Sequence, residues 1–173
     1  MATAKSRTKK APTTLPANIG IDEKNRKAIG ELLNHRLADT TVLYQKTRNY
    51  HWNVTGMHFA ELHEFFEEQY DQMADSIDEI AERVRQMGVF AIGTLDEMKS
   101  YSAVEERPGV IPEAVDMVRD LLNDHEMVIR QLREDIDTVE KMDDMGTADF
   151  LTALMEAHEK MAWMLRSHLE GEQ

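Results

Sequence analysis

Proline is confined to two places in this chain, positions 12 and 16 and positions 108 and 112. Because proline removes a backbone donor and clashes with the preceding turn, it breaks or kinks a helix. The segments 17–107 and 113–173 contain no proline, and they make up most of the 173 residues. Hydrophobic residues form 42% of the chain, which is enough for one core. The sequence therefore predicts a single all-α domain.

Apolar side chains recur at three- and four-residue steps, the period of an amphipathic helix, in four long segments. The segments run from about Asp22 to Asn53, from His58 to Gly88, from Pro112 to the polar residues 142–146, and from Thr147 to Leu169. Between the second and third segments, Thr94 and Glu97 have the spacing of a capping box and predict a short helix that ends near Tyr101. Four long helices with one long crossover describe a ferritin-like four-helix bundle.

The same periodicity predicts which side chains face the core. In the second helix they are Phe59, Leu62, Phe66, Met73, Ile77, Ile80 and Val84, and in the third they are Val115, Val118, Leu122, His125, Ile129, Leu132, Ile136 and Val139. His125 on the third helix and His158 on the fourth lie on apolar stripes. We expect both to be satisfied core or interface histidines and not metal ligands.

The net charge of −13 is divided unevenly along the chain. Residues 1–20 hold four cations and no acid, which leaves 16 bases against 33 acids, a charge of −17, for residues 21–173. The cations are Lys5, Arg7, Lys9 and Lys10. With few large apolar side chains, residues 1–20 are expected to form a flexible basic arm on an acidic ferritin-like domain. Such an arm either contacts phosphates without regard to sequence or only aids solubility.

Cysteine is absent, which excludes disulfides, thiolate metal sites and cysteine nucleophiles. No apolar run approaches the roughly 18 residues that a membrane span requires. The first residues also lack the apolar segment of a secretion signal. We therefore expect a cytoplasmic protein without a membrane partner, associated with the nucleoid if the arm binds DNA.

The segment from His51 to Arg83 carries two histidines and a regular set of carboxylates. At about 100° per residue, Glu67, Asp78 and Glu82 lie about 40°, 60° and 100° around the second helix from His63. All four share a face that is turned about 115° away from the core stripe. A single i, i+4 pair of this kind is more often a solvated face, but a symmetric set with two histidines favours a metal site.

Distances along the second helix indicate how such a site is built. At about 1.5 Å per residue, the His63/Glu67 pair lies roughly 22 Å from the Asp78/Glu82 pair, so one ion cannot contact both pairs of one chain. The two pairs share the midpoint 72.5. A two-fold axis at this point, with two copies of the helix antiparallel, sets the His63/Glu67 pair of one subunit against the Asp78/Glu82 pair of its partner. His51, near the end of the first helix, approaches the hairpin turn at a similar depth. The sequence predicts two equivalent sites in each dimer.

Imidazole nitrogens and carboxylate oxygens without sulfur suit a borderline divalent ion such as Fe(II), Zn or Mn. A larger ferritin or bacterioferritin would instead place Glu-x-x-His pairs inside one four-helix unit. None of the 7 histidines has a glutamate three residues before it. The sequence therefore disfavours a site within one chain.

The segment closely resembles the Dps family, the DNA-binding proteins from starved cells that are also called miniferritins. The matching residues are His51-Trp52-Asn53-Val54, Gly56, Phe59, Leu62-His63, Tyr70, and Asp78 through Ala81-Glu82-Arg83, with further similarity at Thr147-Ala148-Asp149 and Trp163-Met164-Leu165. The resemblance implies that the ferroxidase ligands are His51, His63, Glu67, Asp78 and Glu82, completed across a subunit two-fold axis. At the position of Glu67 the family has Asp or Glu.

The resemblance also implies a hollow dodecamer that oxidises Fe(II), preferably with hydrogen peroxide, and stores the ferric product inside. Some members bind DNA through mobile basic termini, a role that the arm would take here. The family lines the pores through which iron enters with acidic residues, which here would be Asp143, Asp144 and Asp149. Carboxylates at the start of the fourth helix also suit its dipole. The alternative function is a non-enzymatic nucleoid-coating protein, in which the cage only carries the arms.

Overall fold

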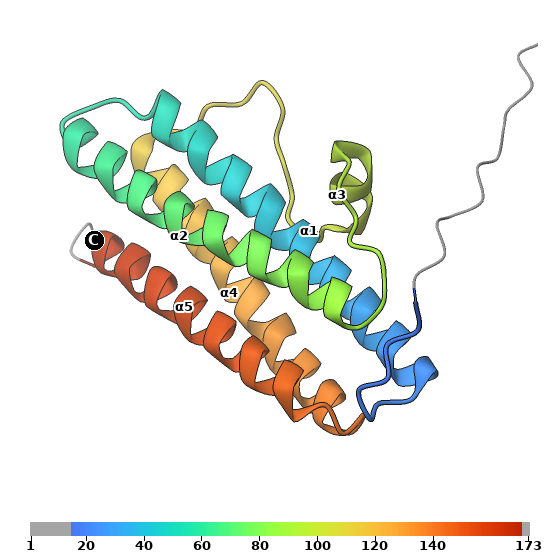
Figure 1. Cartoon of the computed structure of the whole chain (residues 1–173). Coiled ribbons are helices and arrows are strands. Elements are labelled where there is room, and N and C mark those ends of the chain that lie inside the picture. Colours follow the sequence, from blue (N-terminus) through green and yellow to red (C-terminus); the bar gives the residue numbers. More distant parts are fainter. Residues whose placement is uncertain (1–14, 171–173) are drawn as a thin grey trace, which may run out of the picture.

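Four long helices lie side by side in the computed structural model, which describes residues 15–170 (Figure 1). They are α1 (Glu23–Asn53), α2 (Phe59–Gln86), α4 (Ala114–Glu140) and α5 (Met145–Leu169), and the short α3 (Leu95–Tyr101) packs against α1. The predicted all-α bundle with a short helix in its crossover is confirmed. None of these helices combines the length and the apolar character that a membrane span requires. The four arm cations lie outside the described residues, so the boundary at residue 20 stays a prediction.

The bundle consists of two antiparallel hairpins, α1 with α2 and α4 with α5. The crossover from α2 carries α3 past α1 and returns to the end of the bundle at which α2 began, so α2 and α4 run in the same direction (Figure 1). The predicted capping box of Thr94 and Glu97 begins α3. After α3, the buried Asp39 of α1 accepts hydrogen bonds from Ser102 Oγ at 3.0 Å and from the Ala103 amide at 2.6 Å. These bonds fasten the crossover to the hairpin that carries the site.

The start of α5 differs from its prediction by two residues. The helix begins at Met145 and not at Thr147, because Asp144 is the N-cap and its Oδ1 accepts the Thr147 amide at 3.0 Å. An acceptor at this position satisfies one of the free amides of the first turn. Asp143, just before the cap, has a φ of 59°, a conformation that aspartate adopts more readily than most residues.

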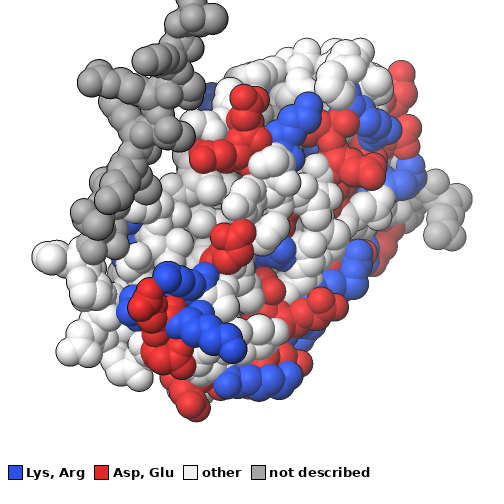
Figure 2. Space-filling view, turned by 90° about the vertical axis from the view of Figure 1, so that its right-hand side faces the viewer, with Lys and Arg blue, Asp and Glu red and all other residues white. Residues whose placement is uncertain are grey.

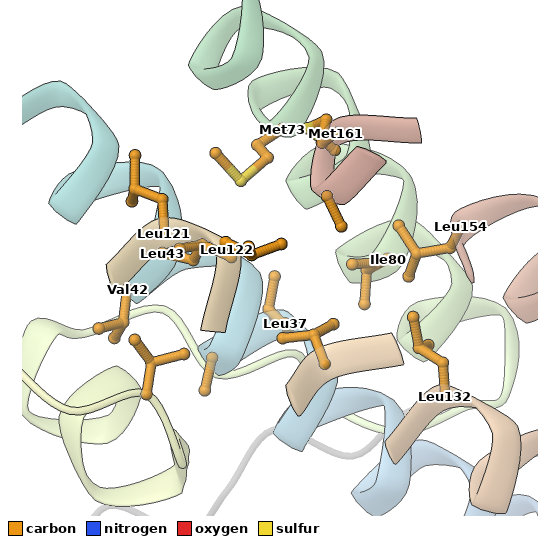
Figure 3. Close-up of a cluster of buried hydrophobic side chains, with 14 of the residues drawn as sticks. Leu37, Val42, Leu43, Met73, Ile80, Leu121, Leu122, Leu132, Leu154 and Met161 are labelled. Carbon is orange, nitrogen blue, oxygen red and sulfur yellow. The ribbon is translucent and has the colours of Figure 1, made fainter. Parts of the chain in front are cut away.

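Side chains from all four long helices converge in the core, including Leu37, Met73, Leu121 and Leu154 (Figure 3). The predicted α2 stripe is wrong at Phe59, which is 46% exposed. The α4 stripe is also broader than predicted: Met117, Leu121 and Val128 are buried, while Val115, Ile129 and Ile136 are half-buried. Because α4 packs against both α5 and α1, it buries a wider face than alternating three- and four-residue steps select.

The core also contains a pair of histidines. His125 and His158 are both 0% exposed, and their Nδ1 atoms lie 2.8 Å apart. One ring must donate and the other accept in this contact, so the two rings are opposite tautomers. Among the described residues, neither Nε2 atom has a hydrogen-bond partner. The pair is buried as predicted, but its hydrogen bonding is only half satisfied.

Candidate metal centre

The turn between α1 and α2 brings His51 and His63 together. It passes through Gly56, whose φ of +109° is open to glycine and strained for other residues. The two imidazoles then stack, with ring centroids 3.7 Å apart and an interplanar angle of 19°. One ring comes from the last turn of α1 and the other from the second turn of α2, so the hairpin itself builds the pair.

Each imidazole donates a hydrogen bond to the backbone of the opposite helix. His51 Nδ1 lies 2.7 Å from the His63 carbonyl oxygen, and His63 Nδ1 lies 2.8 Å from the His51 carbonyl oxygen. A carbonyl oxygen only accepts, so Nδ1 carries a proton in both rings. In the neutral rings Nε2 is therefore the atom free to bind a metal. Metal-bound histidines commonly have this arrangement, with the second nitrogen held by a carbonyl or carboxylate.

Glu67 joins the two histidines one turn along α2. One ligand atom from each of His51, His63 and Glu67 lies within 4.8 Å of the other two. Within the described part of the chain, this is the one group of three potential ligands that meets that distance. His51 is buried, His63 is half-buried and Glu67 is exposed, so the cluster opens to the surface on one side. Two nitrogens and one carboxylate suit a borderline divalent ion and leave coordination positions free.

Two aromatic residues that the prediction did not assign to the site lie against it. Phe59 stacks on His63, with centroids 5.2 Å apart at 30°, which accounts for a large ring outside the core. Tyr70 donates a hydrogen bond from its hydroxyl to Glu67 Oε1 at 3.2 Å, and its ring meets that of His51 edge-on. Partial burial and this hydrogen bond raise the pKa of the Tyr70 phenol. Tyr70 follows His63 by seven residues and so shares its helical face, a signal present in the sequence.

Asp78 and Glu82 lie elsewhere on α2. Both are exposed, and their pair is roughly 22 Å along the helix axis from the His63/Glu67 pair. One chain therefore brings together three of the five predicted ligands. The other two lie on the same helix, at the end away from the α1–α2 turn.

The three acids predicted to line a pore lie in different environments. Asp144 is 4% exposed, and its carboxylate pairs with Arg83 Nη2 at 3.1 Å in addition to capping α5. Arg83 Nε also donates to Thr147 Oγ1 at 2.9 Å, which ties α2 to the first turn of α5. Asp143 and Asp149 are exposed. Of the three, these two present their carboxylates at the surface of the chain.

Comparisons with known proteins agree with this fold. Residues 30–173 match the ferritin-like domain. The chain is 46% identical over 156 residues to an uncharacterized low temperature-induced protein of Nostoc sp. PCC 7120, which covers 90% of this chain and 87% of that protein. It is 39% identical over 144 residues to DNA protection during starvation protein 2 of Bacillus anthracis, covering 83% and 97%.

Comparison of this structure with solved structures agrees with the sequence comparisons. A crystal structure of the Dps protein from Vibrio cholerae O1 superposes with a TM-score of 0.85 at 28% identity, covering 92% of this chain and 100% of that one. That protein is described as a member of a broad superfamily of ferritin-like diiron-carboxylate proteins. The matched domain, the sequence identities and the shared fold together show that the chain belongs to the Dps family of ferritin-like proteins.

Proposed function

We propose that the protein is a ferroxidase that oxidises Fe(II) with hydrogen peroxide and stores the ferric product inside a hollow homododecamer. By removing both reactants, it protects DNA from oxidative damage. The observation that carries the proposal is the pair His51 and His63, whose Nε2 atoms are left free beside the carboxylate of Glu67. The diiron-carboxylate description of the Vibrio cholerae relative supports iron as the substrate metal.

The donor set explains how Fe(II) would react at this site. Two imidazoles and several carboxylates hold the substrate ions through nitrogen and oxygen, and the same donors also suit Zn(II) or Mn(II). Peroxide takes one electron from each of two Fe(II) ions, so its O–O bond breaks and both oxygens leave as hydroxide or water. No hydroxyl radical is released in this two-electron step. The ferric ions then hydrolyse, release protons and move to the interior of the shell.

A second chain is proposed to complete each site. The exposed Asp78 and Glu82 share a helical face with His63 and Glu67, and a two-fold axis near residue 72 sets the two pairs against each other. The exposed Ala74 lies close to this axis, and its small side chain lets two copies of α2 approach. Each site then has two imidazoles from one subunit and carboxylates from both.

Substitutions at the histidines test the proposal. In a His51→Asn/His63→Asn variant, the amide nitrogen of each Asn replaces Nδ1 as the donor to the opposite carbonyl, but Nε2 is lost. His51→Ala/His63→Ala loses both functions. We expect both variants to lose peroxide-dependent Fe(II) oxidation, which is measured by the absorbance of the ferric product. Only the Ala variant should have a lower midpoint of thermal unfolding than the wild type. Unchanged oxidation kinetics in the Asn variant would defeat the proposal.

The arm cations Lys5, Arg7, Lys9 and Lys10 are proposed to bind DNA without sequence preference. The rest of the chain carries −17, and on the face shown in Figure 2 its cations are interspersed with carboxylates. Because the acidic domain repels DNA, attraction has to come from the arms. Several arms on one shell raise the effective concentration of these weak contacts.

Deletion of residues 2–12 tests this assignment. We expect the deletion to abolish DNA retention in a gel-shift experiment at low salt and to leave Fe(II) oxidation unchanged. Binding by the full chain should weaken steeply as salt rises, because it depends on neutralising phosphates. Equal DNA retention after the deletion would contradict the assignment. A nucleoid-coating protein without enzymatic activity would instead bind DNA and fail to oxidise Fe(II).

A further inference from the structure

Tyr70 contacts two of the three clustered ligands from a single position. Its hydroxyl donates to Glu67 Oε1 at 3.2 Å, and its ring lies edge-on to His51, with centroids 5.3 Å apart and an interplanar angle of 84°. The hydrogen bond restrains one carboxylate oxygen and leaves Oε2 of Glu67 for a metal. The edge-on contact restrains the plane of the His51 ring. One side chain thus restrains a ligand on α1 and a ligand on α2.

Arg48 also contacts Tyr70, and its guanidinium lies among three aromatic rings that form a cage around it. Its guanidinium carbon is 5.3 Å from the ring centroid of Tyr44, 5.1 Å from that of Trp52 and 5.5 Å from that of Tyr70. Its Nη1 also donates to the Tyr44 hydroxyl at 2.9 Å. A guanidinium within about 6 Å of the centroid of an aromatic ring is attracted to the face of that ring. The contact with Arg48 therefore restrains the ring of Tyr70.

The partners of Arg48 are aromatic and not acidic. None of the ion pairs within residues 15–170 includes Arg48 or Glu67. A guanidinium paired directly with Glu67 would compete with a metal ion for the carboxylate charge. Held by rings, the same cation can order its surroundings while the charge of Glu67 remains available to a metal.

From these contacts we infer that Tyr70 positions Glu67 and His51 for the metal, and that Arg48 acts on the centre through Tyr70. The inference rests on the proposed function, since it takes His51, His63 and Glu67 as metal ligands. Both are positioning residues. Loss of a group that orients a metal ligand typically weakens metal affinity by about 10–100-fold, and we expect this range here.

Cobalt(II) binding to the assembled, metal-free protein tests the inference without turnover. Tyr70→Phe removes the hydroxyl and keeps the ring. We expect this change to weaken Co(II) binding by at least about 10-fold and to alter the visible absorption spectrum of bound Co(II), which reports ligand geometry. Arg48→Met keeps the aliphatic stem and removes the cation, and should change both readouts in the same direction. In a Tyr70→Leu background, which lacks the ring, Arg48→Met should cause no further loss.

Tyr101→Phe is the matched control. Tyr101 lies on α3 and packs against His35, with centroids 4.9 Å apart, so it touches none of the candidate ligands. His35 is about 24 Å along α1 from His51. This variant should bind Co(II) as the wild type does, with the same spectrum.

The outcomes separate the inference from the proposed function. If the wild type binds no Co(II), the metal centre itself is refuted. If the wild type binds Co(II) and Tyr70→Phe matches it in affinity and spectrum, the role of Tyr70 is refuted and the centre stands. If Arg48→Met weakens binding as much in the Tyr70→Leu background as in the wild type, Arg48 does not act through Tyr70. Circular dichroism verifies folding, and Arg48→Met gives an independent test if Tyr70→Phe fails to fold.

Discussion

Mixing two inactive variants tests whether the metal centre is shared between subunits. The first variant, His51→Asn/His63→Asn, lacks the imidazole ligands and keeps its carboxylates at the far end of α2. The second variant, Asp78→Asn/Glu82→Gln, lacks those carboxylates and keeps both imidazoles. Because the two ligand pairs of one α2 are roughly 22 Å apart, neither chain can repair its own site. Each variant alone should be inactive in peroxide-dependent Fe(II) oxidation.

The expected recovery follows from the two-fold arrangement. A site is intact only if its histidines come from the second variant and its partner carboxylates from the first. In particles assembled at random from equal amounts, each condition holds half the time, so about one quarter of wild-type activity should return. Sites built within one chain would give no recovery at any ratio.

The assay requires particles of known composition. Co-expression of the two variants with different affinity tags, followed by two purification steps, selects mixed particles, and native mass spectrometry counts the subunits. The initial rate of Fe(II) oxidation is then compared per subunit. Particles that combine His51→Asn chains with His63→Asn chains are the control, because both histidines of a site come from one chain and no site is restored. Verified mixed particles that remain inactive would refute the shared centre.

Two further predictions concern the stability of the bundle. Burial lowers the pKa of His158 from 6.5 to about 4 and holds that of His125 well below 6.5, so the unfolded chain binds these protons first. The free energy of unfolding should therefore be unaffected by this pair above pH 6.5 and fall as the pH drops toward 4, by on the order of 3 kcal/mol for His158 alone. Urea titrations at several pH values measure the free energy of unfolding of the wild type and of a His125→Leu/His158→Leu variant. If this free energy depends on pH equally in both proteins, the prediction is wrong. In Gly30→Ala the new Cβ would lie 2.5 Å from Val89 Cγ2, an overpacking that costs about 1–3 kcal/mol. Gly93→Ala, whose Cβ meets nothing within 4 Å, is the control. Equal midpoints of thermal unfolding for Gly30→Ala and the control would contradict the clash.

The helices were predictable because their signals are local. Long segments without proline and a regular apolar period indicate α1 and α2, and the Thr94/Glu97 capping box begins α3 as its spacing suggests. The start of α5 was predicted two residues too late, because Asp143 and Asp144 both precede Thr147 and the sequence does not show which of them caps the helix. The structure selects Asp144, because Arg83 from α2 lies close enough to pair with it.

The meeting of His51, His63 and Glu67 was predictable from the sequence, but the surroundings of this cluster were not. Helical spacing alone places His63 and Glu67 on one face, and proximity to the turn adds His51. The exchange of hydrogen bonds between imidazoles and carbonyls depends on how closely two helices approach, which no spacing rule gives. Phe59 was assigned to the core because it falls on the apolar period of the second helix, but its ring packs on His63.

The two bonds between imidazole and carbonyl have a consequence for repeated use of the centre. They join the end of α1 to the start of α2 through the chain's own groups, so the orientation of the histidines does not depend on a bound metal. Such preorganisation means that binding does not have to order the ligands each time. In the proposed function, the same atoms would still point at the same place after the ferric product has left. The hairpin would therefore bind the next metal ions without first reordering its histidines, as the proposed repeated oxidation of Fe(II) requires.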